Sequence, residues 1–137
     1  MDEALIDSDI LSLFFRGHAE VGENVRRYLD LRPSLNLSIL TYYEILRGLE
    51  HVGSRRRVAA FEEWIALNRV IPMDIEVAKI AARIYAGLKK KGRPIGEADV
   101  LIAATALRYD WVLVTNNLKH FERVPHLRTV SWVSAKA

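Results

Sequence analysis

The chain of 137 residues contains no cysteine. A disulfide framework, a zinc site with thiolate ligands and a cysteine nucleophile are therefore excluded, and any metal site must use oxygen or imidazole ligands. No apolar run reaches the roughly 18 residues of a membrane span, and the opening Met1-Asp2-Glu3 lacks the basic stretch of a signal peptide. We therefore expect a cytoplasmic protein that does not enter a membrane.

Glycine and proline are scarce, with seven and four residues that are spread singly. No linker, internal repeat or low-complexity tract divides the chain, so we predict a single domain over residues 1–137 with a core over residues 4–132. Half of the residues are hydrophobic and 27% are charged, which is typical of a folded globular domain. The net charge of +3 permits a phosphate-rich partner without requiring one.

Short apolar runs alternate with longer helical patterns along the sequence. The runs predicted as strands are Ala4–Ile6, Leu35–Ile39, Arg69–Pro72, Trp111–Val114 and a segment within Leu127–Trp132. The predicted helices lie near residues 10–15, 20–31, 41–51 and 54–68, after Asp74 as a cap, and after Gly96. We therefore predict an α/β fold of three layers (α/β/α), in which helices flank both faces of a parallel sheet of about five strands.

Acidic residues gather where these strands and helices meet. Asp7 and Asp9 directly follow the first strand, Glu44 lies one turn into the helix after the second, and Asp99 heads the helix before the fourth. Ligands bind beyond the carboxyl ends of parallel strands. Carboxylates meeting there repel by about 4 kcal/mol at 4 Å, so a raised pKa or a bound cation must offset the repulsion. Oxygen ligands suit Mg²⁺ or Mn²⁺, and phosphodiester hydrolysis by a metal-activated water is the natural chemistry.

Each of these residues also has a structural explanation. Asp7-Ser8-Asp9 includes a helix N-cap, expected at Ser8 or Asp9. Thr41 and Glu44 match a capping box, and Asp99 would stabilise a helix N-terminus through the helix dipole. Asn116-Asn117 more often forms a turn than a ligand. The coincidence of these residues at one sheet edge, rather than any one of them alone, indicates a functional site.

Four blocks follow one another along the chain, at Leu5–Ser12, Tyr43–Gly48, Gly92–Ala104 and Val112–Asn117, with Phe121, Leu127, Arg128 and Trp132 after them. In this order and spacing the chain resembles the PIN-domain ribonucleases and, among them, the VapC-like toxins of toxin–antitoxin pairs. The resemblance implies a Mg²⁺-dependent endoribonuclease, with Mn²⁺ able to substitute, that leaves 5′-phosphate and 3′-hydroxyl ends on its RNA substrate. It also implies a homodimer and inhibition by a small cognate antitoxin protein.

The resemblance assigns the central roles to three carboxylates. Asp7, Glu44 and Asp99 correspond to the acidic catalytic residues of the family. Asp7 and Asp99 are expected to hold the metal, and Glu44 is expected to position the metal or its water.

Five further residues border this set. Asn117 falls where many family members carry a fourth acid, and a second tightly held metal is therefore not implied. The first block of the family usually reads Asp-Thr-Asn, whereas here Ser8 keeps the hydroxyl group and Asp9 adds a charge. Asp9 would strengthen metal binding or replace the missing acid. We expect Ser8, Asp9, Thr115 and Asn117 to support the site, and Glu97 receives no role.

Two other functions are weighed against this one. Asp-x-Asp after a first strand also occurs in haloacid-dehalogenase-like phosphatases, but those need Gly-Thr after the pair, where this chain has Ile10-Leu11. A PIN-like module that binds RNA or a partner without cleavage is the other alternative, against which the intact Asp7, Glu44 and Asp99 count. The RNA target, the cleavage site and the antitoxin cannot be deduced from the sequence.

Histidines and basic clusters complete the sequence pattern. His18, His51, His120 and His126 show no metal-ligand spacing and are expected to be ordinary surface or loop residues. Arg55–Arg57 and Lys89–Arg93 fit solvated helix ends, with contact to an RNA backbone as the alternative.

Overall fold

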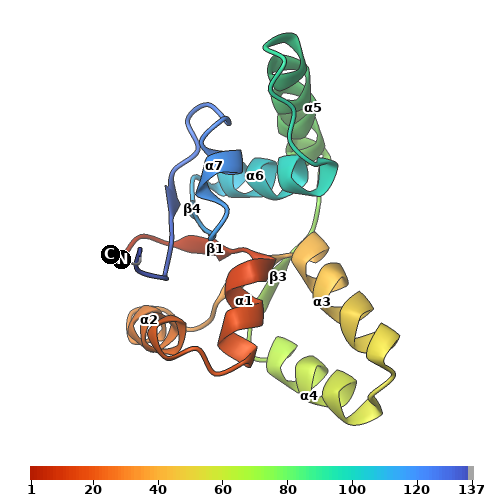
Figure 1. The fold of residues 1–137 in the computed structure, drawn as a ribbon, viewed down its shortest axis with the longest axis vertical. Helices are drawn as coiled ribbons and strands as arrows, with labels where there is room; N and C mark the ends of the chain where they lie inside the picture. Colours follow the sequence, from red (N-terminus) through yellow and green to blue (C-terminus); the bar gives the residue numbers. More distant parts are fainter. Residues whose placement is uncertain (136–137) are drawn as a thin grey trace.

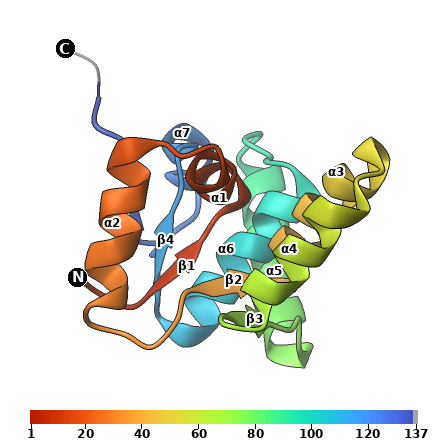
Figure 2. The same cartoon turned by 90° about the horizontal axis from the view of Figure 1, so that it is seen from below.

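Five short strands form one parallel sheet in the computed structural model, which describes residues 1–135. The strands are β1 (Ala4–Ile6), β2 (Asn36–Ser38), β3 (Arg69–Ile71), β4 (Val112–Val114) and β5 (Thr129–Val130). The helices are α1 (Ser8–Phe15), α2 (Ala19–Leu29), α3 (Ile39–Val52), α4 (Arg55–Ile65), α5 (Ile75–Lys90), α6 (Glu97–Tyr109) and α7 (Leu118–Phe121). The sheet order is β3-β2-β1-β4-β5 (Figures 1 and 2).

Helices cover both faces of the sheet and form two separate hydrophobic cores. Side chains of β1 alternate between them: Leu5 joins the core under α5 and α6, whereas Ala4 and Ile6 join the core with α1 and α2. The predicted three-layer α/β/α arrangement with a five-stranded parallel sheet is confirmed. Within residues 1–135, none of the helices has the length and apolar character that crossing a membrane requires.

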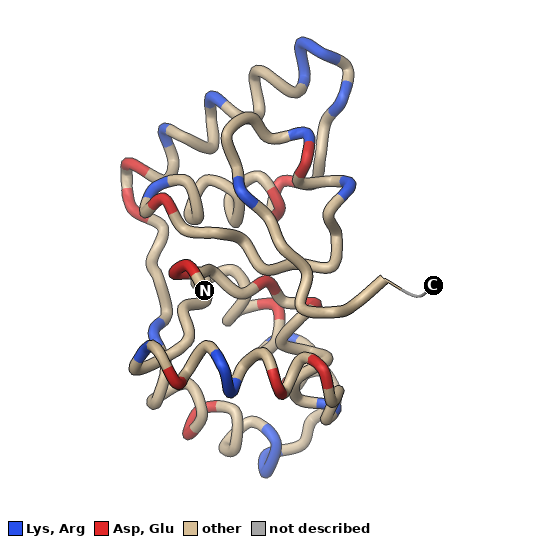
Figure 3. The backbone as a smooth tube through the Cα atoms, turned by 90° about the vertical axis from the view of Figure 1, so that its left-hand side faces the viewer, with Lys and Arg blue, Asp and Glu red and all other residues tan. Residues whose placement is uncertain are grey.

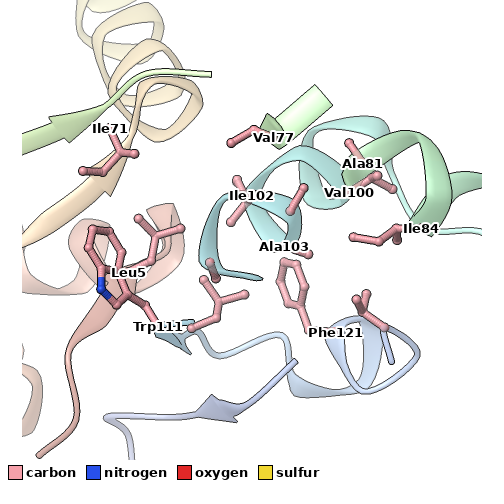
Figure 4. Close-up of a cluster of buried hydrophobic side chains, with 14 of the residues drawn as sticks. Leu5, Ile71, Val77, Ala81, Ile84, Val100, Ile102, Ala103, Trp111 and Phe121 are labelled. Carbon is pink, nitrogen blue, oxygen red and sulfur yellow. The ribbon is translucent and has the colours of Figure 1, made fainter. Parts of the chain in front are cut away.

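Helix α6 is the most deeply buried helix of the described residues. Ile102 and Ala103 are almost completely buried in the core drawn in Figure 4. The polar Thr105 donates its hydroxyl hydrogen bond to Leu101 O within the same helix, at 2.8 Å. Because one core holds α6 over most of its length, its first turn, which carries Asp99, has a fixed position relative to the sheet.

Three helix starts show which polar side chains act as caps. Asp74 caps α5 as predicted and accepts a hydrogen bond from Val77 N. The expectation of a cap at Ser8 or Asp9 is wrong, because Asp7 is the N-cap of α1. The capping-box interpretation of Thr41 and Glu44 is also wrong, because α3 begins earlier and Ser38 is its N-cap. The carboxylate of Glu44 is thereby left available for other contacts.

The order of the strands in the sheet reverses at β1. Strands β2 and β3 lie on one side of β1, and β4 and β5 lie on the other. The register pairs Ile6 with Val114, so the residues that follow them, Asp7 and Thr115, emerge side by side. In open parallel sheets, such a switch point between neighbouring carboxyl ends is where ligands bind.

Candidate active site

Asp7 lies at the centre of the switch point and is 7% exposed. Its Oδ1 accepts a hydrogen bond from Ser8 N at 2.8 Å, and its Oδ2 accepts one from the Thr115 hydroxyl, also at 2.8 Å. Its own backbone N–H donates to Val114 O on β4. Both carboxylate oxygens are therefore fixed by groups from the ends of two neighbouring strands.

Asp7 carries a strong electrostatic perturbation. The pKa of Asp7 is raised from its ordinary value of 3.8 to about 7. Burial is the largest cause of this rise, and the charges of Asp9 and Asp99 contribute to it. The hydrogen bonds from Thr115 and Ser8 act in the opposite direction and lower the pKa of Asp7. The ionised form of Asp7 is thus costly at this position, and a nearby positive charge would relieve that cost.

Asp9 holds the loop after β4. Its Oδ1 accepts from Ile10 N at 2.7 Å, and its Oδ2 accepts from Asn116 N at 2.9 Å. Burial raises the pKa of Asp9, and Asp99 raises it further, while the two backbone hydrogen bonds lower it. Asp7, Asp9 and Thr115 together form what we call the strand wall of the site.

Glu44 approaches the strand wall from α3. The Ser8 hydroxyl lies 2.9 Å from Glu44 Oε1 and 3.2 Å from Thr41 Oγ1, so its single proton is shared between two acceptors on α3. This contact joins the first turn of α1 to the second turn of α3 and ties the carboxylate of Glu44 to the residue that follows Asp7. The hydroxyl that the sequence pattern singled out at Ser8 therefore orients Glu44.

Asp99 approaches from the first turn of α6, and its side chain is 29% exposed. Asp99 Oδ2 lies 3.5 Å from His120 Nδ1. The same ring nitrogen lies 2.8 Å from Asn117 Nδ2. We call Glu44 and Asp99 the helix wall of the site, because both project from helices and both are only partly buried.

The carboxylates gather without forming a closed cage. Within residues 1–135, no group of three or more His, Asp or Glu side chains is arranged closely enough to hold a metal ion by itself. The electrostatic coupling of Asp7, Asp9 and Asp99 still marks one shared volume of negative charge. An all-oxygen donor set with one or two carboxylates suits Mg²⁺, which keeps several water ligands. The side chains therefore fit this metal.

The structure brings most of the predicted site residues into one network. Asp7, Ser8, Asp9 and Thr115 meet at the strand ends, and Glu44 is tied to Ser8. Asn117 does not touch Asp7 by its side chain. It connects through its backbone N–H, which donates to Thr115 Oγ1 at 3.0 Å.

Two features of the site were not predicted, and Glu97 stays outside it. Glu97 is exposed at the start of α6. His120 was expected to be an ordinary surface residue, but it contacts both Asn117 and Asp99. The only sequence signal for His120 is its i, i+3 spacing from Asn117 on one helical turn.

The second unpredicted feature is an apolar groove beside the helix wall. It encloses about 1000 Å³ between α1, α3 and α4, and its lining includes Ser8 and Glu44. Phe15 is 44% exposed there and packs edge-on against Trp64, with ring centroids 4.9 Å apart. The groove therefore reaches the candidate active site, and its lining comes from helices that are distant in the sequence.

The sequence that forms this fold and site matches the model of a known family. The model of the PIN domain family matches residues 4–127, which is most of the chain. The chain therefore belongs to the PIN-domain family.

Within this family, the similar proteins are ribonucleases named VapC. The chain is 35% identical over 112 residues to the tRNA(fMet)-specific endonuclease VapC of Salmonella typhimurium, covering 80% of this chain and 85% of that protein. It is 32% identical over 120 residues to ribonuclease VapC1 of Methanocaldococcus jannaschii, covering 88% and 79%. The family assignment that the sequence blocks suggested is confirmed.

Solved structures of toxin–antitoxin complexes share the fold. A chain of the DNA-bound VapBC complex from Salmonella typhimurium matches with a TM-score of 0.82 and 29% identity, over 97% of this chain and all of the other. A chain of VapBC-1 from nontypeable Haemophilus influenzae matches with a TM-score of 0.80 and 30% identity, over 94% and 97%.

Proposed function

We propose that this chain is a Mg²⁺-dependent endoribonuclease and the toxin of a toxin–antitoxin pair. The observation that carries the proposal is the coupling of Asp7, Asp9 and Asp99, which helps to raise the pKa of Asp7 to about 7 in a buried position. Such a concentration of carboxylates is unfavourable unless a cation is bound. The names of the relatives support RNA as the substrate.

The roles of the residues follow from their contacts. Asp7 and Asp99 would hold Mg²⁺, or Mn²⁺ in its place, and Glu44, which Ser8 holds through a hydrogen bond, would position the metal or its water. Thr115 and Ser8 N keep the Asp7 carboxylate in one orientation. When bound, the cation supplies Lewis acidity, which activates a water for in-line attack on the phosphodiester and offsets charge on the phosphoryl oxygens. An RNA-cleaving toxin acts where RNA is translated, and we therefore place this chain in the cytoplasm.

The basic outer part of α5 is suited to an RNA backbone. No Asp or Glu occurs from residue 77 to residue 96, whereas Lys79, Arg83, Lys89–Lys91 and Arg93 lie in that segment. This basic segment is at the top of Figure 3, with its Lys and Arg positions in blue. Lys and Arg contacts to phosphates give affinity that does not depend on sequence and weakens with salt.

The test of the activity uses Asp7→Asn and Asp99→Asn. We expect each variant to lower Mg²⁺-dependent cleavage of tRNA by about 1000-fold or more, as measured on purified protein with end mapping of the products. EDTA should abolish wild-type cleavage. Asp2→Asn is the matched control, because Asp2 is an exposed aspartate before the amino end of the same strand. Full activity of both site variants would overturn the proposal, as would growth inhibition by induced Asp7→Asn equal to that by wild type.

We also propose that the apolar groove receives the cognate antitoxin. The related structures are complexes of VapC with its antitoxin. Arg16, Arg47 and Arg57 line the groove together with the apolar residues, so it fits a segment that is apolar and acidic. An occupant would lie against Glu44, which accounts for inhibition.

The groove is tested by co-expression with the antitoxin gene that this proposal expects beside the gene for this chain. Phe15→Ala should weaken co-purification of that antitoxin and restore growth inhibition. Tyr85→Ala, an exposed aromatic outside the groove, should leave the complex intact. Equal behaviour of the two variants would contradict the assignment. A homodimer, expected from the family, is checked on the same samples by light scattering.

A further inference from the structure

The short helix α7 places His120 beside the active site on a fixed support. Phe121 is fully buried and points toward α6 in the core of Figure 4. The turn before α7 is held by Asn117 N, which donates to Thr115 Oγ1 at 3.0 Å. The four-residue helix is thus anchored at both ends, although the His120 side chain is 45% exposed.

His120 makes two contacts through one ring nitrogen. Its Nδ1 lies 2.8 Å from Asn117 Nδ2 and 3.5 Å from Asp99 Oδ2. An amide nitrogen can only donate, so in this arrangement Nδ1 accepts from Asn117. This hydrogen bond fixes which way the Asn117 amide faces and leaves its Oδ1 available as an oxygen acceptor or ligand.

These contacts close a chain between the two walls of the site. Thr115 Oγ1 donates to Asp7 Oδ2 and accepts from Asn117 N. The Asn117 amide donates to His120, and His120 contacts Asp99. The groups that connect Asp7 to Asp99 therefore all belong to the loop after β4 and to α7.

We propose that His120 is a positioning residue for the active site. Its Nδ1 accepts from the Asn117 amide and holds that amide in one orientation beside Asp99. The role rests on the proposed function, because it serves the carboxylates assigned there to the metal. It follows that Asn117 Oδ1 keeps one fixed orientation only while His120 is present.

The test exploits the geometry of two amide side chains. Asn at position 120 places a polar atom near the position of Nδ1, whereas Gln places one near the position of Nε2. We expect His120→Ala to lower kcat for RNA cleavage about 10-fold with KM within about twofold, and to weaken Mn²⁺ binding in calorimetry about 10-fold. His120→Asn should recover most of both losses, and His120→Gln should recover little. His51→Ala, at the exposed end of α3, is the control.

Two outcomes would overturn the positioning role. One is wild-type kcat and Mn²⁺ affinity in His120→Ala. The other is a change of KM alone in His120→Ala that His120→Gln reverses, which would mean that Nε2 contacts RNA.

A metal-free NMR measurement separates this proposal from the proposed function. The side-chain NH₂ resonances of Asn117 should shift in His120→Ala and return in His120→Asn, without RNA or metal. If they do so while wild type neither cleaves RNA nor binds Mn²⁺, the contact stands and the proposed function fails. If they do not move, the positioning role fails even in an active enzyme.

Discussion

The strand wall and the helix wall of the site carry the same kind of side chain in opposite surroundings. Asp7 is 7% exposed, receives two hydrogen bonds and has its pKa raised to about 7. The Asp99 side chain is 29% exposed and has one side-chain contact, to His120. Both are assigned to the same metal, and the charge of Asp7 is costly to the fold because Asp7 is buried.

This difference separates the demands of function from those of stability. A partly exposed carboxylate such as Asp99 keeps more of its hydration than a buried one. A buried one such as Asp7 loses that hydration, and its neighbours Asp9 and Asp99 add repulsion. The two walls should therefore respond alike in cleavage assays and differently in metal-free unfolding experiments.

The largest expected difference is in the pH dependence of unfolding without metal. The pKa of Asp7 is about 7 in the folded protein against 3.8 ordinarily, a gap of on the order of 4 kcal/mol. The folded state binds the proton of Asp7 more tightly than the unfolded state does, so protonation of Asp7 stabilises the fold. This stabilisation is complete below about pH 4 and is lost as the pH rises through 7. Asp7→Asn should therefore raise the free energy of unfolding at pH 8 by about 3 kcal/mol, measured by urea denaturation in EDTA.

The helix wall supplies the control for this measurement. Asp99→Asn should change the unfolding free energy at pH 8 by less than about 1 kcal/mol, through weaker repulsion of Asp7. At pH 4 the gain from Asp7→Asn should vanish, since the wild-type side chain is then neutral in the folded protein. Equal gains from the two variants at pH 8 would show that the walls do not differ in this way.

The second prediction removes the support of Asp7 itself. Thr115 is fully buried, and its hydroxyl serves both Asp7 Oδ2 and Asn117 N. Thr115→Val keeps the shape but leaves both groups unpaired, so we expect a loss of about 2 kcal/mol in the free energy of unfolding. The pKa of Asp7 should rise further, because the hydrogen bond from Thr115 lowers it.

A second buried threonine gives the matched control. Thr105 donates only to Leu101 O within α6. Thr105→Val should cost less than about 1 kcal/mol, because that carbonyl can still accept from the helix backbone. If both substitutions cost the same, the hydroxyl of Thr115 has no special role in the strand wall.

The strand wall was more predictable from the sequence than the helix wall. Continuous apolar runs predict buried parallel strands, and a residue that follows such a strand is fixed at the carboxyl edge. Asp7 and Thr115 were placed in this way. The helix N-cap was misjudged by one or two residues, because Asp7, Ser8 and Asp9 all favour that position and only the local backbone decides among them.

The helix wall depends on contacts between distant segments. The Ser8–Glu44 hydrogen bond links residues 36 positions apart, and the pattern of α3 alone suggested a capping box instead. His120 lacks the i, i+4 spacing of a metal site, so its contact with Asp99, which lies 21 positions earlier, was not visible. The groove was equally hidden, because α1, α3 and α4 each contribute only part of its lining.

The smallest expected effect tests the hydrogen bond from Ser8, which lies between Asp7 and Asp9 in the sequence, to Glu44 of the helix wall. The hydroxyl of Ser8 is partly exposed, and its loss leaves Glu44 Oε1 accessible to water. Ser8→Ala should therefore cost only about 0.5 kcal/mol in unfolding but lower kcat for RNA cleavage a few-fold, because Glu44 becomes free to rotate. Ser12→Ala, one turn later on α1, corrects for the change in helix propensity. A loss of stability as large as that of Thr115→Val would mean that the strand wall extends to Ser8, and an unchanged kcat would mean that the orientation of Glu44 does not matter.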